Sequence, residues 1–425
     1  MIEGCSMSNE PQLTTSSLTT PTSWRPVRAA LALVIGSLLA LGPFMAFNGI
    51  LMPARVQAIA PDDKIAIVGL IAASGVIVAT VANVIFGALS DLTRTRFGRR
   101  SPWILVGSIG AGASLLFVSS AETIPLIILG WCFFQLFLNA MIASLIALLP
   151  DRVPVKRRGT FSALYGLGQI IGISTAQIVA PFFLQDITTG MIVFSVAFLA
   201  AGPVVALLAI DNDNRDVERE RISPRMLAQS FSPPTRDAKD YYLVFTGRVL
   251  NIVGTYVVSG YQLFIVQDYL GASQEETATI LSLLGVVSLI SAVVIGTAAG
   301  PISDLAKRRK VFIIGASVLM AGGVLFLFFV PTPWAMFVWA ACNGLGGGVY
   351  NSVEQVVSTE VLPETGTSAK DLGFLNIAAT GGQAIAPAAT SAVIAITGTF
   401  GPIFLFGGGC LLIASVCFGR LKKVR

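Results

Sequence analysis

Residues 87–91 read Gly-Ala-Leu-Ser-Asp, and residues 300–304 read Gly-Pro-Ile-Ser-Asp. Each stretch closes a long apolar run, and 213 positions separate the two aspartates. The same offset relates Leu-Pro-Asp at 149–151 to Leu-Pro-Glu at 362–364. Because self-similarity at a fixed offset is the signature of an internal repeat, the sequence predicts a chain built from two related halves.

The composition around these repeats is that of a membrane protein. Of the 425 residues, 54% are hydrophobic and 12% are charged, whereas a soluble domain carries about 25% charge. Most of the exterior must therefore face lipid. The 42 glycines suit membrane helices, where small residues let backbones approach closely. The basic residues are spread over short loops without forming one basic face, so no nucleic-acid partner is expected.

The apolar runs are long enough to cross a bilayer. A spanning helix needs about 20 apolar residues, and lipid permits only structures that satisfy their own backbone groups. The predicted fold is therefore an all-α membrane protein with twelve transmembrane helices in two six-helix halves. The runs lie near 28–52, 65–90, 102–119, 124–149, 160–184, 188–210, 241–267, 275–300, 310–330, 333–358, 371–396 and 400–419.

The same pattern divides the chain into domains. A Ser- and Thr-rich tail, 1–27, is predicted to be disordered, and residues 28–210 form the first six-helix bundle. A polar linker, 211–240, leads to the second bundle at 241–419 and a short tail at 420–425. Both tails and the linker are expected in the cytoplasm.

The positions of Lys and Arg set this orientation. Nearly all of them fall in the tails and in alternate loops, while Arg55 and Lys64 fall in loops on the other side and Arg248 lies inside a run. Basic loops stay cytoplasmic, so both termini are expected inside a plasma membrane, in keeping with a bacterial inner membrane. An even number of spans in each half makes the repeat parallel, which predicts a solute site between the halves near the membrane midplane.

Residues 87–103, Gly-Ala-Leu-Ser-Asp-Leu-Thr-Arg-Thr-Arg-Phe-Gly-Arg-Arg-Ser-Pro-Trp, resemble the loop 2–3 signature of the major facilitator superfamily. The longer spacing between Asp91 and Gly98 is similar to the sucrose-transporter-like and glycoside–pentoside–hexuronide:cation symporter branches. Residues 354–378, with Glu354-Gln355, Leu-Pro-Glu at 362–364 and Lys-Asp-Leu-Gly-Phe-Leu-Asn-Ile-Ala at 370–378, resemble the tenth and eleventh helices of bacterial sucrose-transporter-like members.

The resemblance implies a secondary transporter that works by alternating access, coupled to protons or sodium. In it, Asp91 closes the cytoplasmic side by pairing with basic residues or a helix N-terminus, and Asp304 does so in the second half. The Lys-Arg-Arg-Lys that follows Asp304 lacks a Gly-Arg-Arg turn, so the second gate is expected to be weaker. The predicted gate comprises Gly87, Asp91, Gly98, Arg99, Arg100, Asp304 and Arg308.

Cation symporters of the glycoside–pentoside–hexuronide branch carry acidic residues within helices two and four. Here the second run has no acid before Asp91, and the fourth run, 124–149, has none. A proton is therefore expected as the coupling ion in preference to sodium.

Two charges lie inside predicted helices, each costing roughly 2.5–3.5 kcal/mol on insertion scales. Arg248 and Glu354 both fall about 10 Å inside the cytoplasmic edge of runs seven and ten. The resemblance implies that both of these helices line the central cavity, so the two side chains could meet. One hypothesis makes Glu354 the proton-binding group under the control of Arg248, with substrate competing for the arginine. The alternative is a static ion pair that braces the second half.

Polar and aromatic side chains within the runs suit a sugar, which needs hydrogen bonds for its hydroxyls and rings for its apolar faces. Gln169 and Gln383 are the strongest candidates because both halves keep them at matching positions. The alternative is hydrogen bonding between helices, worth about 0.6 kcal/mol on average. The candidate substrate residues are Asn48, Trp131, Gln135, Asn139, Gln169, Asn251, Tyr256, Asn343, Tyr350, Asn351 and Gln383.

Other functions find little support in the sequence. There is no histidine, the five cysteines show no metal-ligand spacing, and no nucleophile motif is present, so neither a metal, a cofactor nor an enzyme is expected. A proton-driven exporter of drugs or metabolites stays open, since the same architecture serves both directions. Such exporters carry a glycine- and proline-bearing signature in helix five, which Gly166, Gly168, Gly172 and Pro181 match incompletely.

Overall fold

The computed structural model describes residues 26–154, 157–208, 238–306, 308–362 and 368–422. The predicted tails and linker lie largely outside these ranges. The described part of the chain is all-helical, and ten of its helices are long and apolar enough to cross a membrane. The expected fold class, an all-α protein of the membrane, is confirmed at this level.

The first group of helices, which we call the N-half, spans residues 26–208. Its first apolar run is one long helical segment, because a π-helical turn joins α1 to α2 without a break. The elements are α1 (Pro26–Ala46), the π-helix η1 (Phe47–Leu51), α2 (Met52–Ile59), α3 (Lys64–Leu92), α4 (Ser101–Ser120), α5 (Ile124–Arg152), α6 (Arg158–Val179), the 3-10 helix η3 (Ala180–Phe183) and α7 (Ile187–Leu208).

The second group, the C-half, spans residues 238–422. As in the N-half, some of its helices have a proline in the first turn, where the missing N–H of proline costs nothing. In the C-half these are the helices that start at Pro333 and Gly401. The elements are α9 (Lys239–Ser259), α10 (Gln262–Phe264), the π-helix η4 (Ile265–Tyr269), α11 (Gln274–Ala306), α12 (Arg309–Phe329), α13 (Pro333–Glu360), α14 (Ser368–Thr397) and α15 (Gly401–Gly419).

Helix packing repeats from one half to the other. In the N-half α1 packs against α6 and α7, α3 against α5, and α4 against α5 and α7. In the C-half α9 packs against α14 and α15, α11 against α13, and α12 against α13 and α15. The same correspondence relates the two most extensive contacts between the halves, α3 with α14 and α11 with α6. The sequence repeat therefore has a counterpart in three dimensions.

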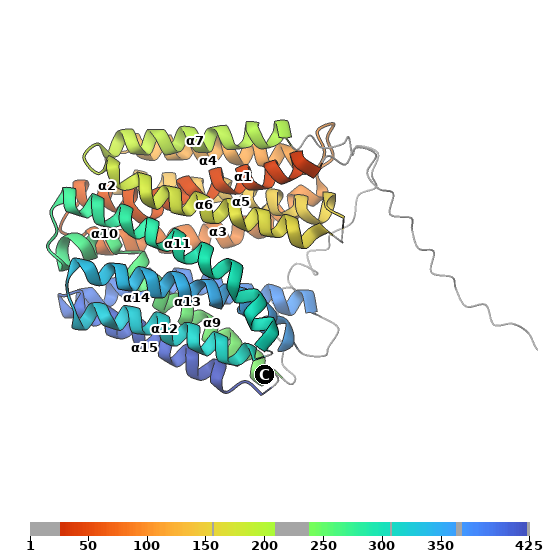
Figure 1. Cartoon of the computed structure of the whole chain (residues 1–425). Coiled ribbons are helices and arrows are strands. Elements are labelled where there is room, and N and C mark those ends of the chain that lie inside the picture. The colour runs from red at the N-terminus through yellow and green to blue at the C-terminus, as the bar shows by residue number, and fades with distance from the viewer. Residues whose placement is uncertain (1–25, 155–156, 209–237, 307, 363–367, 423–425) are drawn as a thin grey trace, which may run out of the picture.

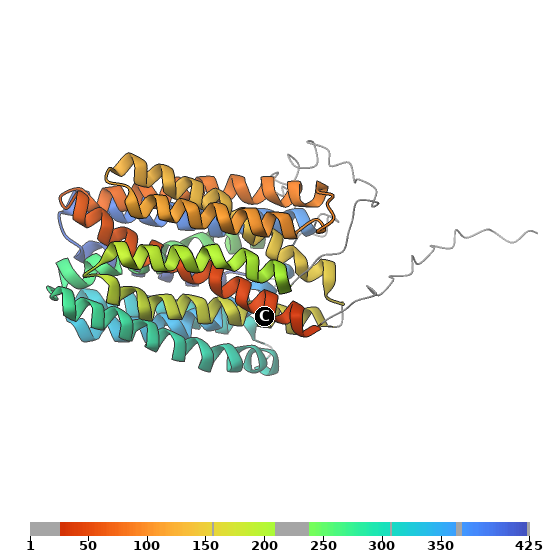
Figure 2. The ribbon, with the colours of Figure 1, turned by 90° about the horizontal axis from the view of Figure 1, so that it is seen from above.

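The long helices run side by side along one axis, so the bundle has two ends (Figures 1 and 2). We call "basic end" the end with the connections at 92–101, 152–158 and 306–309. The "far end" carries the connections at 59–64, 120–124, 183–187 and 397–401. Near the far end, α11 lies beside α6 in Figure 1. Toward the basic end, α11 diverges from α6 and lies closer to the rest of the C-half.

One expected helix differs from the sequence prediction. The seventh run, 241–267, is interrupted, because α9 ends at Ser259 and the chain resumes as the short α10 and the π-helix η4. Gly260, which has no side chain to stabilise a continuous helix, stands at the break. The glycine cluster 344–348 instead lies inside an unbroken α13, where a side chain on Gly346 would collide with Met320 of α12. Gly344 and Gly348 also pack closely, because an added Cβ would collide with Ser291 and Ile295 of α11.

Candidate transport site

The two charges inside the helices meet. Arg248 on α9 and Glu354 on α13 form an ion pair of 3.1 Å between Nη1 and Oε1, with side-chain exposures of 14% and 7%. Ser358, one turn further along α13, donates a hydrogen bond of 2.6 Å to Oε1 of the same carboxylate. The expected contact between Arg248 and Glu354 is therefore present, with Ser358 as a third member that the sequence did not suggest.

An apolar cluster at the basic end of the C-half surrounds this ion pair. Its buried members come mainly from α9, α12, α13, α14 and α15 and include Val244, Val353, Val357 and Phe418. In such surroundings, two charges stay ionised only while paired and hydrogen-bonded, and loss of one partner costs roughly 3–5 kcal/mol. Arg248 and Glu354 are therefore the charged partners of one buried ion pair inside the C-half.

Tyr350 lies one turn before Glu354 on α13, so the two side chains share a helix face. The ring packs against Phe418 at a centroid distance of 6.0 Å, and the hydroxyl is buried without a hydrogen-bond partner among the described residues. A buried hydroxyl without a partner is costly, so it marks a place where a water or a solute oxygen would bind. Asn351, the next residue, is exposed.

The predicted gate of the N-half is a network of ion pairs within that half. Arg100, buried at the start of α4, pairs with Asp91 at 2.6 Å and with Asp151 at 2.8 Å, and it donates to Ser90 Oγ. Arg99 donates its Nε–H to Asp151 Oδ2 at 3.1 Å. The network ties the ends of α3, α4 and α5 together at the basic end.

Asp151 is the member of this network that sequence reasoning missed. It belongs to the Leu-Pro-Asp stretch at 149–151 that recurs in the second half, so the repeat itself was the available signal. Gly98 makes the tight turn before α4 with a φ of +82°, a conformation that L side chains rarely adopt. Gly87 lies on α3, where a side chain would meet open space.

The structure describes only part of the predicted gate in the C-half. Asp304 lies on α11, but its side chain is outside the part of the chain that the structure describes. Arg308 precedes α12 and is exposed, and its neighbour Arg309 forms an ion pair with Glu360 at the end of α13. This pair links α12 to α13, much as Arg99 and Asp151 link α4 to α5.

Three of the five candidate substrate residues of the N-half lie on α5. Trp131 is buried, stacks on Phe44 of α1 at 6.1 Å, and has no hydrogen-bond partner for its indole nitrogen within the described ranges. The side chains of Trp131 and Gln135 both face Gly75 of α3. A Cβ added to Gly75 would lie 2.5 Å from the indole nitrogen of Trp131. Asn139 donates to the Gln135 carbonyl at 2.9 Å, which is a bond within its own helix.

The remaining candidates occupy different environments. Asn251 donates to Ser317 of α12 at 3.1 Å, so its amide serves helix packing inside the C-half. Gln169 on α6 and Gln383 on α14 are half-buried on the two helices that contact the other half of the protein. Asn48, Tyr256 and Asn343 are also half-buried, on η1, α9 and α13.

One further amide lies where the halves meet. Gln262 on α10 is buried, and a Cβ added to Gly49 of η1 would lie 3.5 Å from its Nε2. Its Oε1 has no hydrogen-bond partner among the described residues. The π-helices η1 and η4 lie in corresponding segments of the two halves, and such turns are frequent at functional sites. Gln262 is one of the polar residues of the seventh apolar run, although it is not among the eleven candidate substrate residues.

The hydrogen bonds and ion pairs that the structure gives between the halves lie at the far end. Lys64 at the start of α3 pairs with Asp268 of η4 at 2.7 Å, and the Ser391 hydroxyl of α14 donates to the Ile65 carbonyl. Gln274 and Ser282 of α11 donate to backbone carbonyls of the segment α6–η3. These contacts hold the far end of the bundle together.

Two copies of one helical arrangement, long apolar helices and buried polar groups between them define a multi-pass membrane protein. The sequence profile of the Major Facilitator Superfamily matches residues 30–296 and 244–425. The chain therefore belongs to this superfamily and is a transporter, not an enzyme. No curated protein matches the chain by sequence.

Solved transporters share the fold. A mutant form of the nucleoside transporter NupG has a TM-score of 0.74 and 13% identity, over 93% of this chain and all of its own. A D-xylose-proton symporter gives 0.68 and 16%, over 94% and 99%. The human organic anion transporter MFSD10 gives 0.65 and 14%, over 93% and 100%. At these identities the likeness concerns the fold alone.

Proposed function

We propose that the chain is a secondary active transporter that moves a small solute, a sugar or glycoside, by alternating access coupled to protons. The single observation that carries the coupling is the buried contact between Arg248 and Glu354 in a transporter without histidine. Protonation of Glu354 would neutralise the carboxylate and free the guanidinium for a hydroxyl-rich solute. The fold of a D-xylose-proton symporter is compatible with this assignment but does not specify the solute.

We also propose twelve spans with both termini in the cytoplasm. The helices α11 and α13, of 33 and 28 residues, would join the ten apolar spans, since both are long and pack among them. The basic end carries Arg94, Arg96, Arg99 and Arg100 in one connection, which the positive-inside rule assigns to the cytoplasm of a plasma membrane. The far end would then face outside.

In this orientation the structure corresponds to a state closed on the outer side. The contacts between Lys64 and Asp268 and between Ser391 and Ile65 seal the far end, while Arg100 holds α3, α4 and α5 of the N-half as one unit at the basic end. Rocking of the halves would break the outer contacts and close the cytoplasmic side. Trp131, Gln135, Gln262 and Tyr350 are buried and would be candidates for contact with the solute.

The coupling proposal predicts different results for a Glu354 variant in two transport assays. In proteoliposomes, Glu354→Gln should abolish accumulation driven by an inward proton gradient and leave exchange of solute between the two sides, because exchange needs no net proton movement. Glu360→Gln removes an exposed carboxylate from the same helix and should leave both activities intact. If Glu354→Gln still accumulates solute against a gradient, proton binding at Glu354 is wrong.

Uptake of labelled sucrose and maltose, with and without the proton gradient, tests the solute class. Gradient-driven accumulation of either sugar supports the symporter. Uptake of neither would remove the disaccharide assignment and favour the second candidate, a proton-driven exporter of drugs or metabolites. Solute transport would then be measured in everted vesicles with the proton gradient reversed.

A further inference from the structure

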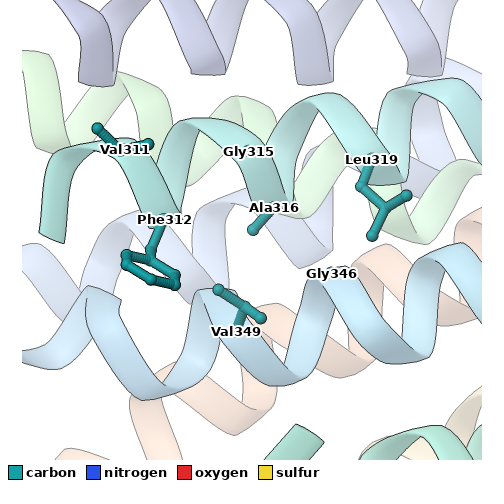
Figure 3. Close-up of a pocket in the computed structure, with 7 residues that line it drawn as sticks. All are labelled: Val311, Phe312, Gly315, Ala316, Leu319, Gly346 and Val349. Carbon is teal, nitrogen blue, oxygen red and sulfur yellow. The ribbon is translucent and has the colours of Figure 1, made fainter. Parts of the chain in front are cut away.

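An apolar groove runs between α12 and α13 on the outside of the C-half (Figure 3). It encloses about 220 Å³, and its seven lining residues are Val311, Phe312, Gly315, Ala316, Leu319, Gly346 and Val349. None of them carries a polar side chain, so the groove offers nothing to a sugar. Val311 is 60% exposed and Leu319 is 41% exposed, which places the groove on the lipid-facing surface of a membrane span.

Gly315 creates the space. A Cβ built at this position would meet no atom within 4 Å, so the missing side chain leaves a hollow that the neighbouring helix does not fill. From Val311 to Leu319 the groove extends about 12 Å along α12. An apolar hollow of this kind stays dry, and in a bilayer the matching occupant is a hydrocarbon chain.

The basic end of the groove carries positive charge. Arg308, immediately before α12, is exposed, and Arg309 pairs with Glu360 to join α12 to α13 just above the groove. Lys310 donates from Nζ to the Leu421 carbonyl at 2.8 Å. Consecutive basic side chains thus stand at the membrane surface over a hollow that suits an acyl chain.

We propose that this groove binds an anionic phospholipid of the cytoplasmic leaflet, with one acyl chain between α12 and α13 and the phosphate on Arg308. Basic pockets between membrane helices on the cytoplasmic side are suited to anionic headgroups, and each Lys or Arg near the surface favours them about fivefold. The lipid would hold α12 against α13, the helix that carries Glu354. The site depends on the orientation proposed above but not on the solute or the coupling ion.

Native mass spectrometry of the purified full chain with equimolar phosphatidylglycerol and phosphatidylcholine tests the site. The wild-type chain should retain phosphatidylglycerol about fivefold over phosphatidylcholine. Gly315→Leu fills the groove and should lose the retained lipid. Gly322→Leu, two turns along the same exposed face and also free of neighbours within 4 Å, is the matched control and should retain it.

The headgroup contact is tested separately by Arg308→Gln, which should reduce the preference for phosphatidylglycerol about fivefold. Arg96→Gln, an exposed arginine at the basic end of the N-half, makes the same charge change away from the groove and should leave the preference unchanged. Equal retention of both lipids by the wild-type chain, or full retention by Gly315→Leu, overturns the site. If Gly315→Leu does not fold, the comparison of Arg308→Gln with Arg96→Gln decides.

Discussion

At the scale of single residues, the buried pair of Arg248 and Glu354 has two possible roles, and both follow from one geometry. The ion pair is 3.1 Å long and largely buried, so removal of one partner would destabilise the C-half whether or not the pair also binds protons. A test of stability therefore has to be separated from a test of transport. Comparison of a variant that lacks one partner of the ion pair with a variant that lacks both separates the two tests.

Arg248→Met should lower the stability of the purified protein by about 3–5 kcal/mol, because it leaves the Glu354 carboxylate buried with Ser358 as its one hydrogen-bond donor among the described residues. The double variant Arg248→Met with Glu354→Met should recover most of that loss, since no buried charge remains. Thermal unfolding in detergent is the measurement. Equal stability of the single and double variants would show that the pair does not behave as an isolated buried ion pair.

Substitution of alanine for two glycines of the predicted gate should have different effects on the stability of the protein. Gly98→Ala should destabilise the protein by roughly 1–2 kcal/mol, because the residue has a φ of +82° that alanine adopts only with strain. Gly87→Ala should be neutral or stabilising, since Gly87 is helical and a Cβ there meets nothing within 4 Å. The difference between their unfolding midpoints checks this, and equal losses at the two sites would contradict it.

At the scale of helices, α1 and α6 approach each other closely through small residues. A Cβ on Gly168 would collide with Ser37 Oγ and with the Val34 carbonyl oxygen of α1. The Ser37 hydroxyl donates across the same contact to the Tyr165 carbonyl at 2.9 Å. Since lipid offers no hydrophobic force to press helices together, such close packing holds this pair.

Gly168→Ala should therefore separate α1 from α6 and cost about 1–3 kcal/mol of stability, the range for an overpacked contact. Gly166→Ala on the same helix should cost nothing measurable, because no atom lies within 4 Å of the added methyl group. Comparison of expression level and unfolding temperature for the two variants is sufficient. A larger loss for Gly166→Ala would mean that the α1–α6 contact is not the determinant.

At the scale of the whole molecule, the two halves are joined through corresponding pairs of helices, α3 with α14 and α11 with α6. The ion pair between Lys64 and Asp268 links the halves directly at the far end, at 2.7 Å. Partly exposed ion pairs contribute about 0–1 kcal/mol each, so this contact is weak enough to open and close. A covalent bond in its place would remove that freedom.

Lys64→Cys with Asp268→Cys, joined by a short bifunctional thiol reagent in a chain whose native cysteines are replaced by serine, should stop transport. Reductive cleavage of the linker should restore it. Arg309→Cys with Glu360→Cys, cross-linked in the same way within the C-half, should leave transport intact because both residues belong to one rigid unit. Undiminished transport with the Lys64–Asp268 positions cross-linked would exclude opening of the far end as a step.

The sequence by itself determined the membrane location, the helical class, most helix positions and the repeat, because apolar length and offset are local properties that the bilayer makes decisive. It also predicted that Arg248 and Glu354 could meet, from their equal depth and from the helix arrangement that the resemblance implies, and the structure shows the contact. Only the tertiary structure decided that Asp151 completes the Arg100 network, that Asn251 serves helix packing and that Gly315 opens a groove. These depend on how each helix is rotated about its axis, which apolar composition leaves undetermined because lipid and neighbouring helices are equally apolar.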